Sequence, residues 1–551
     1  MNRPPRGAKR DGKGTTRRKK PRPAGNGHTD LIRQLWEAAV NLRGSIEPAD
    51  YKRFVLPIVF LRFLSLRYER RRHELERMVK EPGSEYYTKS AKQAAAILED
   101  PDEYRSVGAF ILPKPALWDE IVKHAQADDI KLRLDNALEA LEKAYPDKLR
   151  GLLPRTYAGS NLARENVTGL INLFSRDIFK EDHGGADLVG RVYEYFIGGF
   201  ADSEGKRGGE YFTPVSIVRT LVAMLAPEQG MVFDPCCGSG GMFVQSDLFT
   251  RHSRRLSFVG QESKDFTYRL CRMNLFIHGL DGNIQLGNSY FDDRHAALKA
   301  DYVLANPPFN DGSKSEDGWG ADRLPDKDAR LAVGGQRLPL SPRNANTMWI
   351  LHFLHHLKNG GTAGFVMATG ELSNGETARF EVRKTLVEQG YVDCIVQLTG
   401  QLFANTQIPC SLWFLSKNRD GQKGHRARQG EILFIDGRKL GFLIPGSRKQ
   451  KQLSDEEIHR IASVYRAYCS GDRPGDIAGF CKVAALDDVR GHNYVLTPGR
   501  YVGAEDGPDD DEPFEEKFPR LVKQLEEQFS RSAELEQAIR ASLASLIDGR
   551  A

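Results

Sequence analysis

The spacing of hydrophobic residues divides the chain into a helical part and a part in which helices alternate with strands. Hydrophobic residues recur every three or four positions over residues 31–42, which is the spacing of one face of a helix. A second helix is predicted to follow, with Asp50 as a candidate N-cap and with Pro57 either kinking the helix or delaying its start. We therefore expect an N-terminal helical domain over residues 29–165.

From about residue 166 the pattern changes to short runs of strand-forming residues separated by helical stretches. This alternation predicts a mostly parallel sheet covered by helices, an α/β fold, which we assign to residues 166–480. The predicted strands are Met231–Asp234, Leu256–Gln261, Tyr302–Ala305, Thr362–Ala368, Val392–Leu398 and Cys410–Leu415. A polar, glycine-rich segment without clear periodicity lies between Asn310 and Asn346, and such a segment is typical of a functional or mobile loop.

The C-terminal part of the chain has a different pattern again. Residues 481–513 form a region that ends in an acidic, turn-rich linker. In residues 514–551 hydrophobic residues then return at spacings of three and four, which predicts an amphipathic, near-heptad helix. This helix could pack on its own domain or on another subunit, and its position behind a linker favours contact with another subunit.

Composition and charge add a polar tail to this picture. The length of 551 residues favours two or three domains. Residues 1–28 carry ten Lys and Arg and one Asp, a net charge of +9 in a chain whose total is +5, so the remainder is nearly neutral. A segment this polar cannot bury apolar surface and is predicted to be disordered. It would serve either as an arm that attracts nucleic acid or as a solubilising extension.

The cysteines and the hydrophobic runs exclude several classes of protein. The chain has seven Cys and no CxxC pair, so we predict neither a disulfide framework nor a metal site. The longest apolar stretch, residues 54–61, is too short to span a bilayer. We expect a cytoplasmic protein.

The first candidate site follows the strand that ends at Asp234. Asp234 and Pro235 lead into a glycine-rich turn, in which glycine lets the backbone approach a ligand closely. In doubly wound sheets such a strand–turn–helix junction binds a nucleotide-like cofactor. The turn is not a P-loop, because no Gly-Lys-Ser/Thr follows it. Its candidate residues are Gly238, Ser239, Gly240 and Gly241.

Two further polar positions follow later strands. Glu262 ends the next predicted strand, 28 positions after Asp234, where a carboxylate can accept hydrogen bonds from ribose hydroxyls. Asn288 follows another possible strand and could lie over the adenine of the cofactor, although an ordinary polar turn explains it equally well.

The sharpest signal is a strand that ends in Asn306, Pro307, Pro308 and Phe309. The two prolines fix φ and donate no hydrogen bonds, so the loop is stiff and keeps free carbonyl acceptors. The side-chain oxygen of Asn306 and the carbonyl of Pro307 can accept both N–H groups of an exocyclic amine. The ring of Phe309 supplies a face on which a base can stack. We predict that this loop is catalytic.

A block of residues before the glycine turn completes the set. Thr213 and Pro214 read as an N-cap and a proline at the first helical position, and that helix N-terminus could hold a carboxylate. The aromatic residues of the block could equally belong to the core. The block consists of Glu210, Tyr211, Phe212, Thr213, Pro214 and Val215.

Taken in this order, the glycine turn, Glu262 and the Asn-Pro-Pro-Phe loop resemble the amino-methyltransferases of DNA. The block Glu210–Val215, which precedes the glycine turn, is similar to that of the N6-adenine class that includes modification subunits of type I restriction–modification systems. The resemblance extends over residues 29–548. Cys236, Cys237 and Met242 depart from the usual glycine block.

The resemblance implies a Rossmann-like, S-adenosylmethionine-dependent methyltransferase sheet with an N-terminal helical domain and a C-terminal helical extension. It also implies that S-adenosylmethionine is bound by the blocks 210–215 and 239–241 and by Glu262. The substrate would be an adenine flipped out of double-stranded DNA. The partners would be a specificity subunit that reads the DNA, a second copy of this chain and, in some complexes, a restriction subunit. Cytosine N4, a protein amide and a non-catalytic scaffold remain as alternatives.

Overall fold

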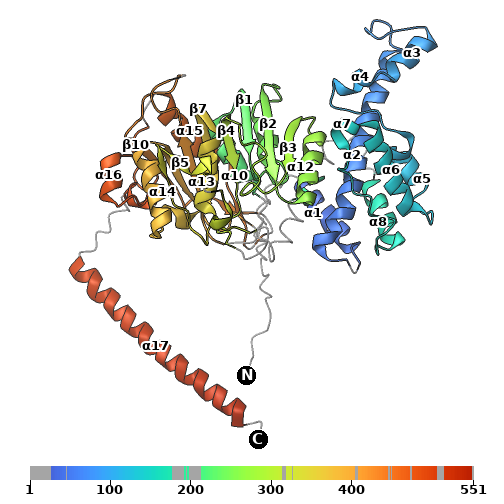
Figure 1. The fold of residues 1–551 in the computed structure, drawn as a ribbon. Coiled ribbons are helices and arrows are strands. Elements are labelled where there is room, and N and C mark those ends of the chain that lie inside the picture. The colour runs from blue at the N-terminus through green and yellow to red at the C-terminus, as the bar shows by residue number, and fades with distance from the viewer. Residues whose placement is uncertain are drawn as a thin grey trace, which may run out of the picture.

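The computed structural model describes residues 27–44, 46–176, 192–193, 195–197, 213–312, 318–325, 327–403, 407–422, 424–444, 447, 449–471, 474–504 and 514–548. A helical domain and a domain built on one large sheet lie side by side, and a long C-terminal helix lies apart from both (Figure 1). Except for its last two residues, the basic tail 1–28 lies outside the described residues, as does the acidic part of the linker, 505–513.

The N-terminal domain is helical, as predicted. Its core is built mainly from buried aliphatic and aromatic residues of α2, α6 and α8. The last helix, α8, crosses the predicted domain boundary at residue 165. The elements are α1 (Gly27–Asn41), α2 (Pro48–Met78), α3 (Ala91–Leu98), α4 (Pro101–Arg105), η1 (Lys114–Ala116), α5 (Trp118–Lys123), α6 (Ile130–Ala144), α7 (Pro146–Leu149) and α8 (Arg164–Phe174).

Helix α2 corrects two predictions about its start. The helix begins at Pro48 and contains Pro57, so the predicted delay of its start was wrong. Glu47 holds the N-cap position and Asp50 lies in the first turn, so Asp50 is not the N-cap. Pro48 explains the earlier start, because proline has the φ of a helix and the first helical turn needs no N–H from it.

The second domain is a nine-stranded sheet, which confirms the predicted α/β fold. The six predicted strands correspond to β1, β2, β4, β7, β8 and β9, whereas β10 and β13 were not predicted. In spatial order the strands are β13 (Cys481–Ala485), β10 (Glu431–Gly437), β8 (Val392–Leu398), β9 (Cys410–Ser416), β7 (Leu357–Ala368), β4 (Ala300–Ala305), β1 (Gly230–Asp234), β2 (Leu256–Glu262) and β3 (Gly282–Leu286).

The strand directions bring the carboxyl ends of most strands to one edge. Strands β3, β2, β1, β4 and β7 are parallel to one another. Strand β9 runs against its neighbours β7 and β8, and β13 runs against β10, so β8 and β10 point the same way as β4. The strand order reverses between β1 and β4, and such a switch point opens a crevice at the carboxyl edge.

Helices cover both faces of the sheet (Figure 1). Neighbouring strand residues point to opposite faces of a sheet, so Val232 and Phe233 of β1 join two different hydrophobic cores. Helices cover the sheet over each of these cores. Helix α12 also packs on α2 and joins the sheet to the helical domain. One face carries α13 (Asn346–His356) and α14 (Thr377–Glu388), and the other carries α10 (Val215–Leu225), α11 (Gly241–Phe249), α12 (Asp265–Ile277) and α15 (Asp455–Ser470).

The segment between Asn310 and Asn346 is more structured than a loop. Its described residues form η4 (Ala321–Arg323), η5 (Ala329–Leu331) and the hairpin β5–β6 (Ala332–Val333 and Gln336–Arg337). They bury five large side chains against the α13 face of the sheet. These are Trp319, Leu324, Leu331, Val333 and Leu338.

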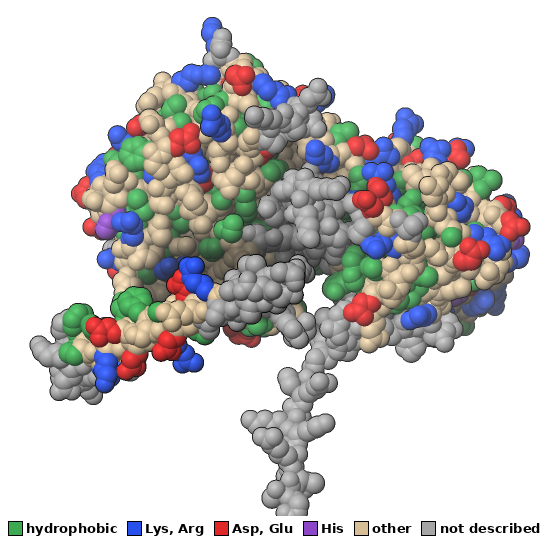
Figure 2. Space-filling model, turned by 90° about the horizontal axis from the view of Figure 1, so that it is seen from below, with side chains coloured by type: hydrophobic (Ala, Val, Ile, Leu, Met, Phe, Trp, Pro, Cys, Tyr) green, Lys and Arg blue, Asp and Glu red, His purple; other side chains and the backbone are tan. Residues whose placement is uncertain are grey.

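After the sheet the chain continues through α16 (Leu486–Gly491) and η7 (Pro498–Arg500) to α17 (Phe514–Asp548), which confirms the predicted C-terminal helix. The side chains of α17 that the structure describes are exposed, and they include hydrophobic, acidic and basic ones (Figure 2). No helix in the described part of the chain is both long and apolar enough to cross a membrane.

Candidate functional site

The predicted site residues that the structure describes gather at the carboxyl edge near the β1/β4 switch point. Asp234 ends β1, Glu262 ends β2, Asn288 follows β3 and Asn306 follows β4. Because these four strands are parallel, their ends meet at one edge. Glu210, Tyr211 and Phe212 lie outside the described residues, so their predicted role stays a prediction.

The glycine turn has the geometry of a ligand cradle. Gly238 and Gly240 have φ values of +54° and +80°, a conformation that favours glycine. A Cβ at Gly240 would come within 2.9 Å of Cys271 Sγ, whereas one at Gly238 or Gly241 would meet no atom of the described residues within 4 Å. The turn therefore packs closely against Cys271 at Gly240, whereas the described residues leave space beside Gly238 and Gly241.

The buried side chain of Glu262 joins the strand end to this turn. Its Oε2 accepts a hydrogen bond from the Gly238 amide at 3.0 Å, and its Oε1 accepts one from the Lys264 amide at 2.9 Å. The Glu262 carbonyl accepts from the Gly287 amide, which holds Asn288 at the same edge. The Asn288 Oδ1 accepts from the Tyr290 amide at 3.0 Å. Hydrogen bonds thus connect cofactor-binding candidates at the ends of three different strands.

Asp234 is a buried carboxyl behind the turn. Its Oδ1 accepts a hydrogen bond from the Cys236 amide at 3.0 Å. Burial raises the pKa of Asp234 to about 7; the charge of Glu262 adds to this rise, and the hydrogen bonds with Cys236 oppose it. At neutral pH this carboxyl therefore lies close to its midpoint, where a nearby positive charge would ionise it.

The catalytic-loop candidate Asn306 is oriented by one specific contact. Its Nδ2 donates to Thr213 Oγ1 at 2.9 Å. Its Oδ1 is buried and accepts no hydrogen bond from any described residue. A buried acceptor without a donor is costly in a folded protein, so this oxygen is suited to receive an N–H from a ligand.

The contact with Thr213 corrects the prediction for this residue. Helix α10 has Pro214 at its N-cap position, no side chain caps it, and Val215 is its first residue. The predicted Thr213 N-cap was therefore wrong. Thr213 instead fixes the amide of Asn306 with its oxygen directed away from the threonine hydroxyl.

The end of the loop is held by buried polar side chains. The ring of Phe309 is half-buried and meets Phe403 edge-on, with 6.0 Å between ring centroids. Asn310 has a φ of +54°, and its amide donates to Asn346 Oδ1 at 2.8 Å. Asn346 Nδ2 donates in turn to Asn310 Oδ1 at 3.0 Å and to Glu371 Oε1 at 2.8 Å. Sequence reasoning did not find Asn346 or Glu371, because they lie outside the motif.

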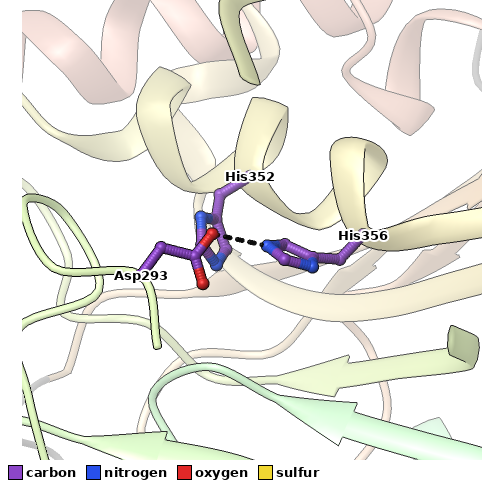
Figure 3. Close-up of side chains that lie close together, drawn as sticks. All are labelled: Asp293, His352 and His356. Carbon is purple, nitrogen blue, oxygen red and sulfur yellow. Dashed lines mark hydrogen bonds and ion pairs between the residues drawn. The ribbon is translucent and has the colours of Figure 1, made fainter. Parts of the chain in front are cut away.

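The structure also brings together Asp293, His352 and His356, which sequence reasoning missed (Figure 3). The two histidines are four residues apart on α13, and the potential ligand atoms of the three residues lie within 4.8 Å of one another. The only sequence signal was that histidine spacing. This set of residue types could hold a metal ion.

The contacts of these side chains favour a hydrogen-bond network over a metal site. Both ring nitrogens of His356 face acceptors, the carbonyl of Leu298 and Asp293 Oδ2, each at 3.0 Å. The Nδ1 of His352 lies 3.2 Å from a guanidinium nitrogen of Arg330, which can only donate. Burial lowers the pKa of His352 well below its usual value, so the ring is neutral. In this arrangement the lone pair of His352 Nδ1 is already engaged by Arg330, and both ring nitrogens of His356 already face oxygen atoms of the protein.

The arrangement at the carboxyl edge can hold a nucleotide-like cofactor beside a planar amine. The turn and Glu262 would contact the cofactor, and Asn306 and Phe309 would contact the amine. An amide oxygen, a carbonyl and an aromatic ring position and stack a base but supply no nucleophile. The chemistry they support is transfer of a group to an oriented amine.

Comparisons with known proteins agree with this arrangement. A family model described as N-6 DNA Methylase matches residues 184–510, and one described as HsdM N-terminal domain matches residues 31–174. The chain is 40% identical over 522 residues to the type I restriction enzyme MjaIX methylase subunit of Methanocaldococcus jannaschii, covering 94% of this chain and 90% of that protein. It is 40% identical over 428 residues to the HindI methylase subunit of Haemophilus influenzae, covering 75% and 92% of the two chains.

A solved structure shows the same fold. The methyltransferase subunit of a type I restriction–modification system from Streptococcus thermophilus is similar with a TM-score of 0.66 and 24% identity, covering 86% of this chain and 99% of that one. With the match of the family model over more than half of the residues, these comparisons show that the chain belongs to the N-6 DNA methylase family.

Proposed function

We propose that this chain transfers a methyl group from S-adenosylmethionine to N6 of adenine in DNA, as the modification subunit of a type I restriction–modification complex. The observation that carries this proposal is the buried Oδ1 of Asn306, at the same sheet edge as the glycine turn, which accepts no hydrogen bond from any described residue. Membership of the N-6 DNA methylase family supports the reaction, and the type I names of the two 40%-identical relatives support the kind of complex.

The residues of the turn fit S-adenosylmethionine. The open space at Gly238 and Gly241 leaves room for a ligand against the backbone. Glu262 offers a carboxylate for the ribose hydroxyls, and Asp234 offers a buried carboxyl for a cationic ligand. When bound, the cofactor supplies a methyl group on a sulfonium, which an amine can take without a protein nucleophile.

The residues of the chain bind and orient the target amine. The Oδ1 of Asn306 and the carbonyl of Pro307 each accept one N–H of the exocyclic amine, which directs the nitrogen lone pair out of the base plane toward the methyl donor. Thr213 prevents the amide of Asn306 from turning its Nδ2 toward the amine. Flipping the adenine out of the duplex costs roughly a few kcal/mol, and stacking on Phe309 offsets part of this cost.

The raised pKa of Asp234 predicts a pH-dependent affinity for the cofactor. Below its pKa of about 7 the carboxyl is neutral, and above it the carboxyl is an anion that attracts the positively charged cofactor. We expect the Kd for S-adenosylmethionine to fall by up to about tenfold per pH unit as the pH rises toward 7, and then to level off. Calorimetric titrations between pH 5.5 and 8.5 would measure this dependence. Asp234→Asn should remove it, and an equally steep profile in that variant would assign the titration to another group.

Methyl transfer from radiolabelled S-adenosylmethionine tests the proposed reaction. The purified chain, alone and with a co-expressed specificity subunit, would be incubated with duplex DNA and the labelled nucleoside then identified. Label in N6-methyladenine supports the proposal. Label in N4-methylcytosine or in protein would support the other amine substrates, and cofactor binding without transfer would support a scaffold.

Helix α17 is the proposed contact with a partner subunit. Its 35 residues carry large hydrophobic side chains that remain exposed, among them Leu521, Leu525 and Phe529. A helix with such a stripe is stabilised when another helix covers it. The specificity subunit of the complex is the proposed partner, and it would also bring a second copy of this chain to the assembly.

Disrupting this hydrophobic stripe should weaken assembly with the specificity subunit and leave cofactor binding unchanged. Replacing Leu521, Leu525 and Phe529 by Ser should weaken binding of the specificity subunit by roughly 10³-fold, from the loss of about 1.5 kcal/mol or more per buried side chain. The Kd for S-adenosylmethionine should not change. Pull-down with a tagged specificity subunit measures the loss, and Glu527→Ser with Arg531→Ser is the matched control on the same helix. Undiminished co-purification of the triple variant would contradict the assignment.

A further inference from the structure

A small hairpin of unassigned role stands at the same edge as the catalytic loop. Phe442–Leu443 (β11) pairs with Lys451–Gln452 (β12) in antiparallel register. The hairpin begins after the carboxyl end of β10. Since β10 points the same way as β4, the hairpin and the Asn306 loop leave the sheet at the same edge.

The hairpin is braced against the loop whose Phe403 contacts Phe309. The Lys451 amide donates to the carbonyl of Gln401 at 2.8 Å. The side chain of Gln450 donates to the carbonyl of Leu402 at 3.5 Å. The next residue is Phe403, whose ring contacts Phe309. The loop that carries Phe403 therefore also supports the hairpin.

A second brace fixes the base of the hairpin. The amide of Gly441 donates to Glu457 Oε1 at 2.8 Å, and the same carboxylate closes the capping box of α15. Gly441 has a φ of +92°, and a Cβ there would come within 3.1 Å of Thr399. The hairpin is thus attached to two elements of the domain and is held in a defined place.

Its surface combines exposed hydrophobic side chains with positive charge. Phe442 is 42% exposed and Leu443 is 49% exposed. Residues 438–452 contain five Lys and Arg and no Asp or Glu. Of the described basic residues, Arg438 pairs with Asp436, the ammonium of Lys451 donates to Thr399 Oγ1 at 3.4 Å, and Lys449 is exposed.

We propose that this hairpin contacts duplex DNA at the target adenine. The lysines of the hairpin would lie on phosphates. Phe442 and Leu443 would fill the space that the flipped adenine leaves in the base stack. The inference rests on the proposed function. The basic charge of the segment and its connection through Phe403 to Phe309 favour DNA as the occupant over a protein. Apolar side chains that enter a base stack stabilise a distorted duplex, and cations near phosphates add affinity that falls with salt.

A double variant tests the insertion. Phe442→Ser with Leu443→Ser would be assayed in the complex with its specificity subunit on two duplexes that differ only at the target adenine. In one duplex the adenine is paired, and in the other it stands opposite an abasic site. We expect methylation of the paired duplex to fall by about tenfold or more, and that of the unpaired duplex to change by less than about twofold, because the unpaired base costs little to extrude. Leu132→Ser, at an exposed leucine of the helical domain, is the matched control.

A charge variant tests the phosphate contacts. Lys449→Ala should lower the slope of log Kd against log salt by about one unit on any DNA sequence. For the double variant, two rate results would overturn the inference: equal losses on both duplexes, or an unchanged rate on the paired duplex. Loss of the specificity subunit from the double variant would overturn it as well. The last result would assign the hairpin to a protein interface. Absence of methylation by the unaltered complex would instead overturn the proposed function.

Discussion

Replacing Asn306 by Ala is expected to lower methyl transfer by on the order of 10²–10³-fold, the effect of removing one positioned hydrogen-bonding group from an active site. The reason is that the Oδ1 of Asn306 is the buried acceptor available to the target amine. The Kd for S-adenosylmethionine should stay within about twofold of its original value, since the lost contact belongs to the amine. Single-turnover methylation and calorimetry measure the two quantities separately.

Variants at Thr213 test whether the orientation of the Asn306 side-chain amide, and not only its presence, is needed for methylation. Thr213→Val removes the oxygen that accepts from Asn306 Nδ2, so the amide can turn, and turnover should fall by roughly tenfold, the cost of about one hydrogen bond. Thr213→Ser keeps the hydroxyl and should retain most of the activity. Full methylation by Asn306→Ala, or equal activity of the two Thr213 variants, would contradict this account of the loop.

Replacing Glu262 by Ala is expected to produce the opposite pattern, with a large loss of cofactor affinity. Hydrogen bonds to a charged group contribute about 1.5–3 kcal/mol, so the Kd for S-adenosylmethionine should rise by roughly 10- to 150-fold. The variant also removes the acceptor of the Gly238 amide and so loosens the glycine turn. Saturating cofactor should restore much of the rate, because Asn306 and Phe309 are untouched.

The conservative variant Glu262→Gln serves as the control. It keeps the shape of the side chain and one carbonyl acceptor, so its affinity for the cofactor should lie between those of the original chain and the alanine variant. Unchanged affinity in Glu262→Ala would show that this carboxylate does not contact the cofactor.

The sequence predicted the central strands well because each is a short hydrophobic run that ends in a turn. Strands β1, β2 and β4 are of this kind, and their ends carry Asp234, Glu262 and Asn306. The segment from Asn310 to Asn346 was harder. Trp319 lies alone between two glycines, and Leu331 and Val333 belong to a run of only three apolar residues, which is too short to show a period of two or 3.6.

Tertiary contacts explain what the sequence could not reveal at the site. Thr213 looked like a helix cap because Pro214 follows it, yet its hydroxyl bonds with Asn306, 93 residues away in the chain. Asn346 and Glu371 hold the loop through contacts that depend on how α13 meets the end of β4. No local pattern encodes such pairings, because they arise only when the strands come together.

The central claim is that Asn306 positions an adenine amine for methylation. The most direct test incubates DNA with the complex of this chain and its specificity subunit, and then quantifies methylated nucleosides by mass spectrometry for the original chain and for Asn306→Ala. We predict N6-methyladenine with the original chain and almost none with the variant, although both bind S-adenosylmethionine equally. Equal amounts of N6-methyladenine from the two proteins would contradict the claim.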